Sequence, residues 1–419
     1  MENQNSTVRF VPDAPQRVVV RGYDWGKGLC SAILRLEEPV PPEAVSPRLF
    51  EQVVEERESF DWATFRPEHI VVRVSRRVVD AYLCSPDGVR SETPAQNVRV
   101  DFACDPTTTP SCFDLLTQRG NWCDPYRLIY TVGGETFAPP VDLRNADLPQ
   151  LKPFCLNRSF TGSDGRTLTY AFYEPEERKT APEKKFPLVV WLHGAGEGGT
   201  DSVWPLTGNK ATALASPEFQ QAMGGGAYLL LPQTAGFWME YDKPDTWQQN
   251  PGRPSVYTRT LSELIGAFLA EHPAIDPARV LLCGCSNGGY MALNMAMQEP
   301  ERYAAVVPIC EAYRDEGIPE ELLAGIRQLP LWFVYAENDD VVQPDLYEKP
   351  TIARLRALGA DMRVSVFKDV HDLYGMTDPR TGKPWQFSGH WSWVYFFNNE
   401  CRDPDTGERI WDWMGRQKR

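Results

Sequence analysis

The chain has 419 residues, more than one hydrophobic core ordinarily holds, so at least two domains are expected. Its 57 acidic and 43 basic side chains give a formal net charge of −14, which disfavours nucleic acid and anionic lipid as partners. No apolar run reaches the roughly 20 residues that cross a bilayer, and residues 1–15 show no secretory signal, so a cytoplasmic protein without membrane contact is expected.

The first third of the chain is predicted to be all β. Short apolar runs alternate with Pro, Gly, Asn and Asp, the pattern of strands joined by turns, and no amphipathic helix interrupts them. The predicted strands lie within 16–23, 31–40, 69–79, 81–88, 97–104 and 126–132. A series of this length and spacing predicts an immunoglobulin-like β-sandwich.

A proline-rich stretch follows at 137–154, and its composition indicates a stiff connector. We therefore divide the chain into a β-domain with its linker at 1–150 and a second domain at 151–419. The ten cysteines are scattered and none has the CxxC spacing of a zinc site. Cys104, Cys112 and Cys123 do cluster, and whether they form a disulfide is open, although a reducing compartment argues against it.

The second domain is predicted to be α/β. Apolar strands alternate with helical segments, which is typical of a parallel sheet covered by helices on both faces. In one such segment the apolar residues share a helical face: Leu261, Leu264, Ile265, Phe268 and Leu269. The predicted strands lie at 186–193, 227–233, 279–285, 303–310, 331–337 and 362–368.

Gly284, Ser286 and Gly288 form the pattern G-x-S-x-G. The pattern alone is weak evidence, but here it follows a predicted strand and begins a helix. A tight turn in that position exposes a serine hydroxyl and leaves no room for Cβ atoms at the glycines. Ser286 is therefore the expected nucleophile, the alternative being an ordinary helix N-cap.

A serine that attacks a carbonyl needs N–H donors for the oxygen that becomes negative. The Gly-rich loop 193–201 follows the strand at 186–193, and we expect the N–H groups of Ala195 and Asn287 to form the oxyanion hole. His193 reads as a structural brace of this loop rather than a base. Glu197 either braces the loop or contacts substrate.

The residues alone leave the other two members of a triad open. Asp339 and Asp340 both follow the strand at 331–337, where sites on parallel sheets are built. The base is either His371, just after the last predicted strand, or His390, in the stretch FSGHWSW. Ser, then Asp, then His is the expected chain order for such a sheet.

Taken together, these motifs resemble α/β-hydrolase esterases related to prolyl oligopeptidases, dienelactone hydrolases, feruloyl esterases and polyhydroxybutyrate depolymerases. More narrowly, the chain resembles bacterial esterases with an N-terminal immunoglobulin-like domain. The resemblance rests on GYDWG at 22–26, WLHGAGEGGTD at 191–201, IDPARVLLCGCSNGGYMAL at 275–293, AENDDVV at 336–342 and GHWSWVYFFNN at 389–399.

The resemblance implies a fold and two site residues. It implies an α/β-hydrolase fold after the β-sandwich, with Asp339 as the triad carboxylate and His390, in the G-H-x-S-W pattern, as the base. Two departures matter. The segment 372–388 is inserted before Gly389, and Glu311 stands where the family often has glycine, which places an acidic group near the expected substrate.

The expected reaction is hydrolysis of a carboxylic ester through an acyl-enzyme, on small or carbohydrate-linked acyl esters. It needs no cofactor and no metal. The alternatives are a serine peptidase of the prolyl oligopeptidase type and a non-catalytic binding protein. Trp238 and Trp247 are candidate substrate contacts, with core packing as the alternative. A homo-oligomer formed through the β-domain is possible, and the natural ester is not specified.

Overall fold

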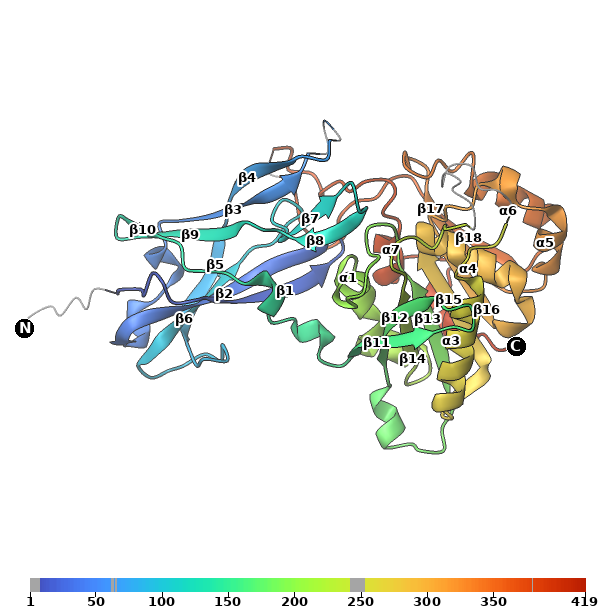
Figure 1. Cartoon of the computed structure of the whole chain (residues 1–419), viewed down its shortest axis with the longest axis horizontal. Coiled ribbons are helices and arrows are strands. Elements are labelled where there is room, and N and C mark those ends of the chain that lie inside the picture. Colours follow the sequence, from blue (N-terminus) through green and yellow to red (C-terminus); the bar gives the residue numbers. More distant parts are fainter. Residues whose placement is uncertain (1–7, 62–63, 65, 242–252, 379) are drawn as a thin grey trace, which may run out of the picture. The chain divides into compact units, whose positions relative to one another are not determined.

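The computed structural model describes residues 8–61, 64, 66–241, 253–378 and 380–419. The chain divides into two compact units, Met1–Lys152 and Pro153–Arg419 (Figure 1). The division lies in the proline-rich stretch, close to the boundary expected after residue 150. Among the described residues, no helix is long and apolar enough to span a bilayer.

The first unit consists of two four-stranded antiparallel sheets and a small hairpin (Figure 1). One sheet has the order β1-β2-β6-β5, and its strands are Arg17–Tyr23, Gly26–Val40, Ala95–Phe102 and Val78–Cys84. The other has the order β10-β9-β3-β4, and its strands are Glu135–Phe137, Tyr126–Val132, Gln52–Phe60 and His69–Ser75. The hairpin pairs β7, Ser111–Asp114, with β8, Arg119–Trp122.

The two sheets share one apolar core, which makes the unit a β-sandwich. Val20 and Leu34 of the first sheet are buried in the same cluster as Val53 and Leu128 of the second. Alternate residues of β6 and β9 face this cluster, as the period of a strand requires. The all-β prediction is confirmed, while kinship with immunoglobulin domains stays a prediction.

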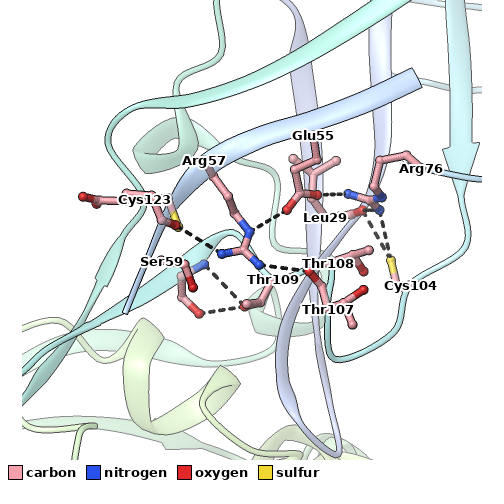
Figure 2. A network of polar contacts seen from close by, with 12 residues as sticks. Leu29, Glu55, Arg57, Ser59, Arg76, Cys104, Thr107, Thr108, Thr109 and Cys123 are labelled. Atoms are coloured by element: carbon pink, nitrogen blue, oxygen red, sulfur yellow. Dashed lines mark hydrogen bonds and ion pairs between the residues drawn. The ribbon is translucent and has the colours of Figure 1, made fainter. Parts of the chain in front are cut away.

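Strand β3 buries two charged side chains as well as apolar ones. Val53, Glu55 and Arg57 alternate along the strand and are all buried. Figure 2 shows the Glu55 carboxylate between two guanidinium groups: Arg57 Nε donates to it at 2.8 Å, and Arg76 donates through Nη1. Arg76 also donates to the carbonyl of Leu29 at 2.7 Å. This fully internal ion network lies inside the core of the sandwich.

The second unit is built on one eight-stranded sheet in the order β11-β12-β14-β13-β15-β16-β17-β18 (Figure 1). The first two strands, Cys155–Thr161 and Thr167–Tyr173, run antiparallel and were not predicted. The parallel strands β13 to β18 are Phe186–Leu192, Tyr228–Gln233, Ile275–Cys285, Ala305–Ile309, Leu331–Ala336 and Met362–Phe367. Each lies where an apolar run predicted it.

The connections between the strands carry helices, as expected for an α/β unit. Leu261, Leu264, Ile265 and Phe268 are buried along one face of α3, which confirms the predicted stripe. Helix α4 follows β15 and packs on β15 and β16. The helices α1 to α8 are Val203–Thr207, Pro217–Ala222, Thr258–Glu271, Asn287–Gln298, Glu320–Gly325, Glu348–Ala357, Trp393–Phe397 and Ile410–Arg416.

All ten cysteines are free thiols, so the structure forms no disulfide among Cys104, Cys112 and Cys123.

Candidate active site

Ser286 lies on the sharp turn between β15 and α4. Its backbone angles are φ 55° and ψ −118°, a conformation that is costly for a residue with a Cβ. The turn is held on both sides, because the Ser286 N–H donates to the Ile309 carbonyl at 2.8 Å and the Ser286 carbonyl accepts from Tyr290 N–H at 2.9 Å. The predicted G-x-S-x-G motif therefore folds as a strained strand-to-helix turn.

The glycines of the motif are required by close backbone contacts. A Cβ on Gly284 would lie 2.3 Å from the Gly288 carbonyl oxygen, and one on Gly288 would lie 2.0 Å from the Leu192 carbonyl oxygen. Gly289 has the same constraint, since its Cβ would lie 2.8 Å from Glu311 Cα. The start of α4 thus packs directly on β13 and on the end of β16, and larger residues would displace Ser286.

The structure brings Ser286, His390 and Asp339 together in one hydrogen-bonded chain. His390 Nε2 lies 2.9 Å from Ser286 Oγ, and His390 Nδ1 lies 2.7 Å from Asp339 Oδ2. The carboxylate can only accept, so Nδ1 carries a proton and Nε2 presents its lone pair to the serine hydroxyl. The histidine side chain is only 10% exposed, and its ring packs edge-on against Trp393.

Asp339 is fixed in place by the loop that follows β17. Its Oδ1 accepts from the N–H groups of Val341 and Val342, both at 2.9 Å, which leaves Oδ2 facing His390. The Asp339 side chain is fully buried, whereas Asp340 is exposed. Of the two neighbouring aspartates, only Asp339 contacts the histidine.

His371 lies elsewhere and has its own partners. Its Nδ1 is 2.6 Å from Asp369 Oδ1 and 3.3 Å from Tyr395 Oη. The inserted segment begins after it and folds back as a hairpin, with bridges joining His371 to Gln386 and Thr377 to Pro384. The insertion is thus an excursion that returns the chain to Gly389.

Gly389 allows the backbone next to His390 to lie against the loop that carries Asp339. A Cβ at this position would lie 2.3 Å from the carbonyl oxygen of Asn338, the residue before Asp339. The backbones that carry the base and the carboxylate therefore touch at Gly389. The sequence motif includes this glycine but does not reveal its role, because the contact joins two segments that are far apart in the chain.

The loop after β13 is braced from within. His193 is completely buried, and burial lowers its pKa to about 4, so the ring is neutral at ordinary pH. It accepts from Thr234 N–H at Nε2, at 3.2 Å, and donates from Nδ1 to the Gly194 carbonyl at 2.8 Å. Glu197, which is also buried, accepts from Gly194 N–H at 2.8 Å. Both side chains hold the loop, so the expectation that Glu197 contacts substrate is replaced by its alternative.

The expected oxyanion donors lie on this loop and on α4. Ala195 is exposed and follows the braced Gly194. Asn287 is the first residue of α4, where a backbone N–H has no acceptor within the helix. Its side chain has a separate role that the sequence did not indicate, because Asn287 Oδ1 accepts from Trp238 N–H at 2.6 Å.

Of the two tryptophans expected to contact substrate, Trp238 and Trp247, the structure describes only the first. Trp238 is completely buried and packs against His193, at 5.1 Å between ring centroids, and edge-on against Tyr257. It belongs to the core, which corrects its assignment as a substrate contact. Trp247 falls outside the described residues.

Glu311, the acidic residue expected near substrate, lies beside the start of α4, where a Cβ on Gly289 would be 2.8 Å from its Cα. It is completely buried, and its Oε2 accepts from Tyr313 N–H at 2.6 Å. Burial raises its pKa to about 8, so the carboxyl is protonated near neutral pH. Glu311 is therefore a buried, neutral carboxyl group rather than an exposed charge.

Three comparisons with known proteins agree on the class. Residues 177–374 match the family described as phospholipase/carboxylesterase. A poly(3-hydroxybutyrate) depolymerase of Ralstonia pickettii is 28% identical over 144 residues, 34% of this chain and 29% of that protein. The S-formylglutathione hydrolase of Bos taurus is 26% identical over 163 residues, again 34% of this chain and 52% of its own length. The chain thus spans only about a third to a half of these curated relatives.

A solved structure extends the likeness to both units. The crystal structure of a thermostable esterase aligns with a TM-score of 0.70 over 96% of this chain and 99% of its own, at 22% sequence identity. At this identity the match speaks for the fold. Together with the family match, it supports the α/β-hydrolase fold for the second unit.

Proposed function

We propose that this protein hydrolyses carboxylic esters through an acyl-enzyme formed on Ser286, with His390 as general base and Asp339 as its orienting carboxylate. The observation that carries the proposal is the chain of two hydrogen bonds, 2.9 Å and 2.7 Å long, that joins the three residues. The strained turn that presents Ser286 supports the same assignment.

In the first half-reaction, Ser286 Oγ attacks the ester carbonyl carbon while its proton passes to His390 Nε2. Asp339 stabilises the imidazolium through Nδ1–H. The N–H groups of Ala195 and Asn287 donate to the carbonyl oxygen as it becomes negative. His390 then gives the proton to the leaving alkoxide, which departs as an alcohol.

In the second half-reaction, a water molecule takes the place of the alcohol. His390 Nε2 removes its proton as the oxygen attacks the acyl carbon, and the same N–H donors stabilise the second tetrahedral intermediate. The Ser286 oxygen leaves with the proton returned by His390, which releases the carboxylic acid.

For the substrate we propose small or carbohydrate-linked acyl esters. Relatives include a poly(3-hydroxybutyrate) depolymerase and S-formylglutathione hydrolases, whose names describe ester or thioester cleavage. Kinship of the β-sandwich with immunoglobulin domains is part of the same proposal and is supported by its two packed antiparallel sheets.

The first experiment measures hydrolysis of short p-nitrophenyl esters by the full chain and by Ser286→Ala. The variant is expected to lose at least about 10⁴-fold in kcat, because the covalent step is removed. The matched control is Ser163→Ala, which changes an exposed serine of the same unit. Thermal unfolding of both variants checks that the fold is retained.

A second measurement separates an esterase from a peptidase. The full chain is offered p-nitrophenyl acyl esters and proline-containing peptide p-nitroanilides, and a phosphonate inhibitor is used to label the nucleophile. Turnover of the esters with labelling at Ser286 supports the proposal. Full activity of Ser286→Ala, or phosphonate attached to another residue, would contradict it.

A further inference from the structure

Three potential metal ligands meet in the first unit. Glu58 of β3, His69 of β4 and Cys112 of β7 each offer one ligand atom, and the three atoms lie within 4.8 Å of one another. The three residues come from separate strands, so no local spacing in the sequence marks them. A nitrogen, a sulfur and a carboxylate oxygen form a donor set that suits Zn²⁺.

The contacts of His69 place its Nδ1 beside the Glu58 carboxylate. His69 Nε2 lies 3.2 Å from the carbonyl oxygen of Phe113, which can only accept, so this nitrogen carries a proton. His69 Nδ1 then faces Glu58 Oε2 at 3.0 Å. In this tautomer Nδ1 and Oε2 both direct lone pairs into the space between them, which is how two ligands of one metal ion are arranged.

The surroundings of these residues resemble those of a metal site. A ligating histidine ordinarily donates its other N–H to a carbonyl or carboxylate, as His69 does to Phe113. Glu58 is held in the same way, because its Oε1 accepts from Asp124 N–H at 2.8 Å and leaves Oε2 toward His69. Both side chains are partly exposed, at 18% for Glu58 and 27% for His69, so an ion can enter from solvent.

Cys112 is the ligand whose chemistry decides the class of metal. The residue is buried, and burial raises the pKa of its thiol to about 11, so without a metal it stays protonated. A soft thiolate and an imidazole exclude Mg²⁺ and Ca²⁺, which prefer oxygen ligands, and favour Zn²⁺ and related ions.

We propose that Glu58, His69 and Cys112 bind one divalent transition-metal ion of the Zn²⁺ class. On binding, the Cys112 S–H bond breaks, an Sγ–metal bond forms, and the proton passes to solvent water. Tetrahedral Zn²⁺ sets its ligand atoms roughly 3.4 Å apart. Because the three atoms lie within 4.8 Å of one another, each separation shortens by at most about 1.4 Å on binding, within reach of a side-chain rotation. A water molecule completes the coordination.

Arg57, a cationic side chain next to Glu58 in the chain, is held by other partners. Arg57 lies on β3 with Glu58. Its guanidinium donates to Glu55 at 2.8 Å and to the carbonyls of Glu58 and Thr107, at 3.1 and 2.9 Å. Figure 2 shows the Arg57 guanidinium bonded to Glu55 and Thr107. Arg57 is thereby held away from the Glu58 carboxylate while its charge favours a thiolate at Cys112.

The test uses Co²⁺ as a probe for the full chain, with the thiols kept reduced. Co²⁺ is expected to bind at one equivalent and to produce the near-ultraviolet charge-transfer band of a thiolate ligand. Cys112→Ser is expected to lose this band, and His69→Ala and Glu58→Gln to weaken Co²⁺ binding at least about tenfold. Added Zn²⁺ should displace Co²⁺ and raise the thermal midpoint of the unaltered chain alone.

The chain contains a matched control for the ligand pair. His371 and Asp369 form another partly exposed histidine–carboxylate pair, with no cysteine in the contact, and Cys155 is an exposed thiol. His371→Ala and Cys155→Ser are expected to bind Co²⁺ like the unaltered chain. Absence of the band, or a band that survives Cys112→Ser, would overturn the proposal and leave Glu58 and His69 as an ion pair.

Discussion

At the scale of single residues, the candidate site depends on one strained serine and on glycines at positions where a Cβ atom would not fit. Ser286 is held in a costly backbone conformation by hydrogen bonds from its own peptide. Gly284 and Gly288 allow α4 to approach β13, and Gly389 allows the His390 turn to touch Asn338. Reactive atoms are thus placed by backbone contacts, which change little when side chains move.

Gly389→Ala is expected to damage catalysis more than folding. Its Cβ would meet the Asn338 carbonyl at 2.3 Å, so the backbone must shift by about 1 Å where the base meets its carboxylate. A misplacement of that size costs about 10²-fold in kcat with little change in KM. Steady-state kinetics on a p-nitrophenyl ester measure the effect. Gly325→Ala, at a position where a Cβ meets nothing within 4 Å, is the control that should stay fully active.

The two neighbouring aspartates provide a paired test. Asp339→Asn is expected to lower kcat by roughly 10³- to 10⁴-fold, because an amide no longer fixes the tautomer of His390. Asp340→Asn changes an exposed side chain and should leave kcat unaltered. Equal kinetics for the two variants would remove Asp339 from the assignment.

At the scale of elements, the sequence predicted those strands whose buried residues are apolar. Strands β13 to β17 were found because both faces of a central parallel strand are covered, so most of their residues are apolar. Strand β11 is an edge strand whose residues are mostly exposed, so it gives no apolar signal. Strand β3 was missed for a different reason, since Glu55 and Arg57 face inward.

The β3 network gives a stability prediction. Glu55→Gln leaves the buried Arg57 and Arg76 without their shared counter-charge, and is expected to cost about 3–5 kcal/mol of unfolding free energy. Glu56→Gln, the adjacent residue on the opposite face, loses only exposed partners and should change little. Urea unfolding of each variant compares the two, and similar midpoints would contradict this account.

The same scale explains which site residues could be predicted. Ser286 was identifiable because its motif, strand and helix are contiguous in the chain. The choice between His371 and His390 was open to residue-level reasoning, because it depends on the hairpin at 372–388 and its bridges. Trp238 was misassigned because apolar residues of a pocket and of a core look alike in sequence.

At the scale of the whole molecule, buried ionisable groups make stability depend on pH. Burial raises the pKa of Glu311 from its ordinary 4.5 to about 8, and it raises that of Glu348 well above its ordinary value. Between pH 4.5 and 8 the folded chain holds a proton that the unfolded chain has released. Stability attributable to Glu311 is therefore complete below pH 4.5 and declines up to about pH 8.

Glu311→Gln is expected to flatten this decline. The amide keeps the oxygen that accepts from Tyr313 N–H and has no proton to lose, so the variant gains on the unaltered chain as pH rises, by roughly 1.4 kcal/mol per unit. Chemical unfolding at pH 5 and pH 8 measures the difference. Glu321→Gln, at an exposed site, should show no such gain, and a pH-independent effect of Glu311→Gln would refute the assignment.

The central claim is that His390 is the base that acts on Ser286, and its most direct test compares two histidine variants. His390→Ala is expected to lose kcat for a p-nitrophenyl ester to nearly the level of Ser286→Ala, since members of one triad act as a unit. His371→Ala, which removes only contacts to Asp369 and Tyr395, should stay active. An inactive His371→Ala together with an active His390→Ala would contradict the account.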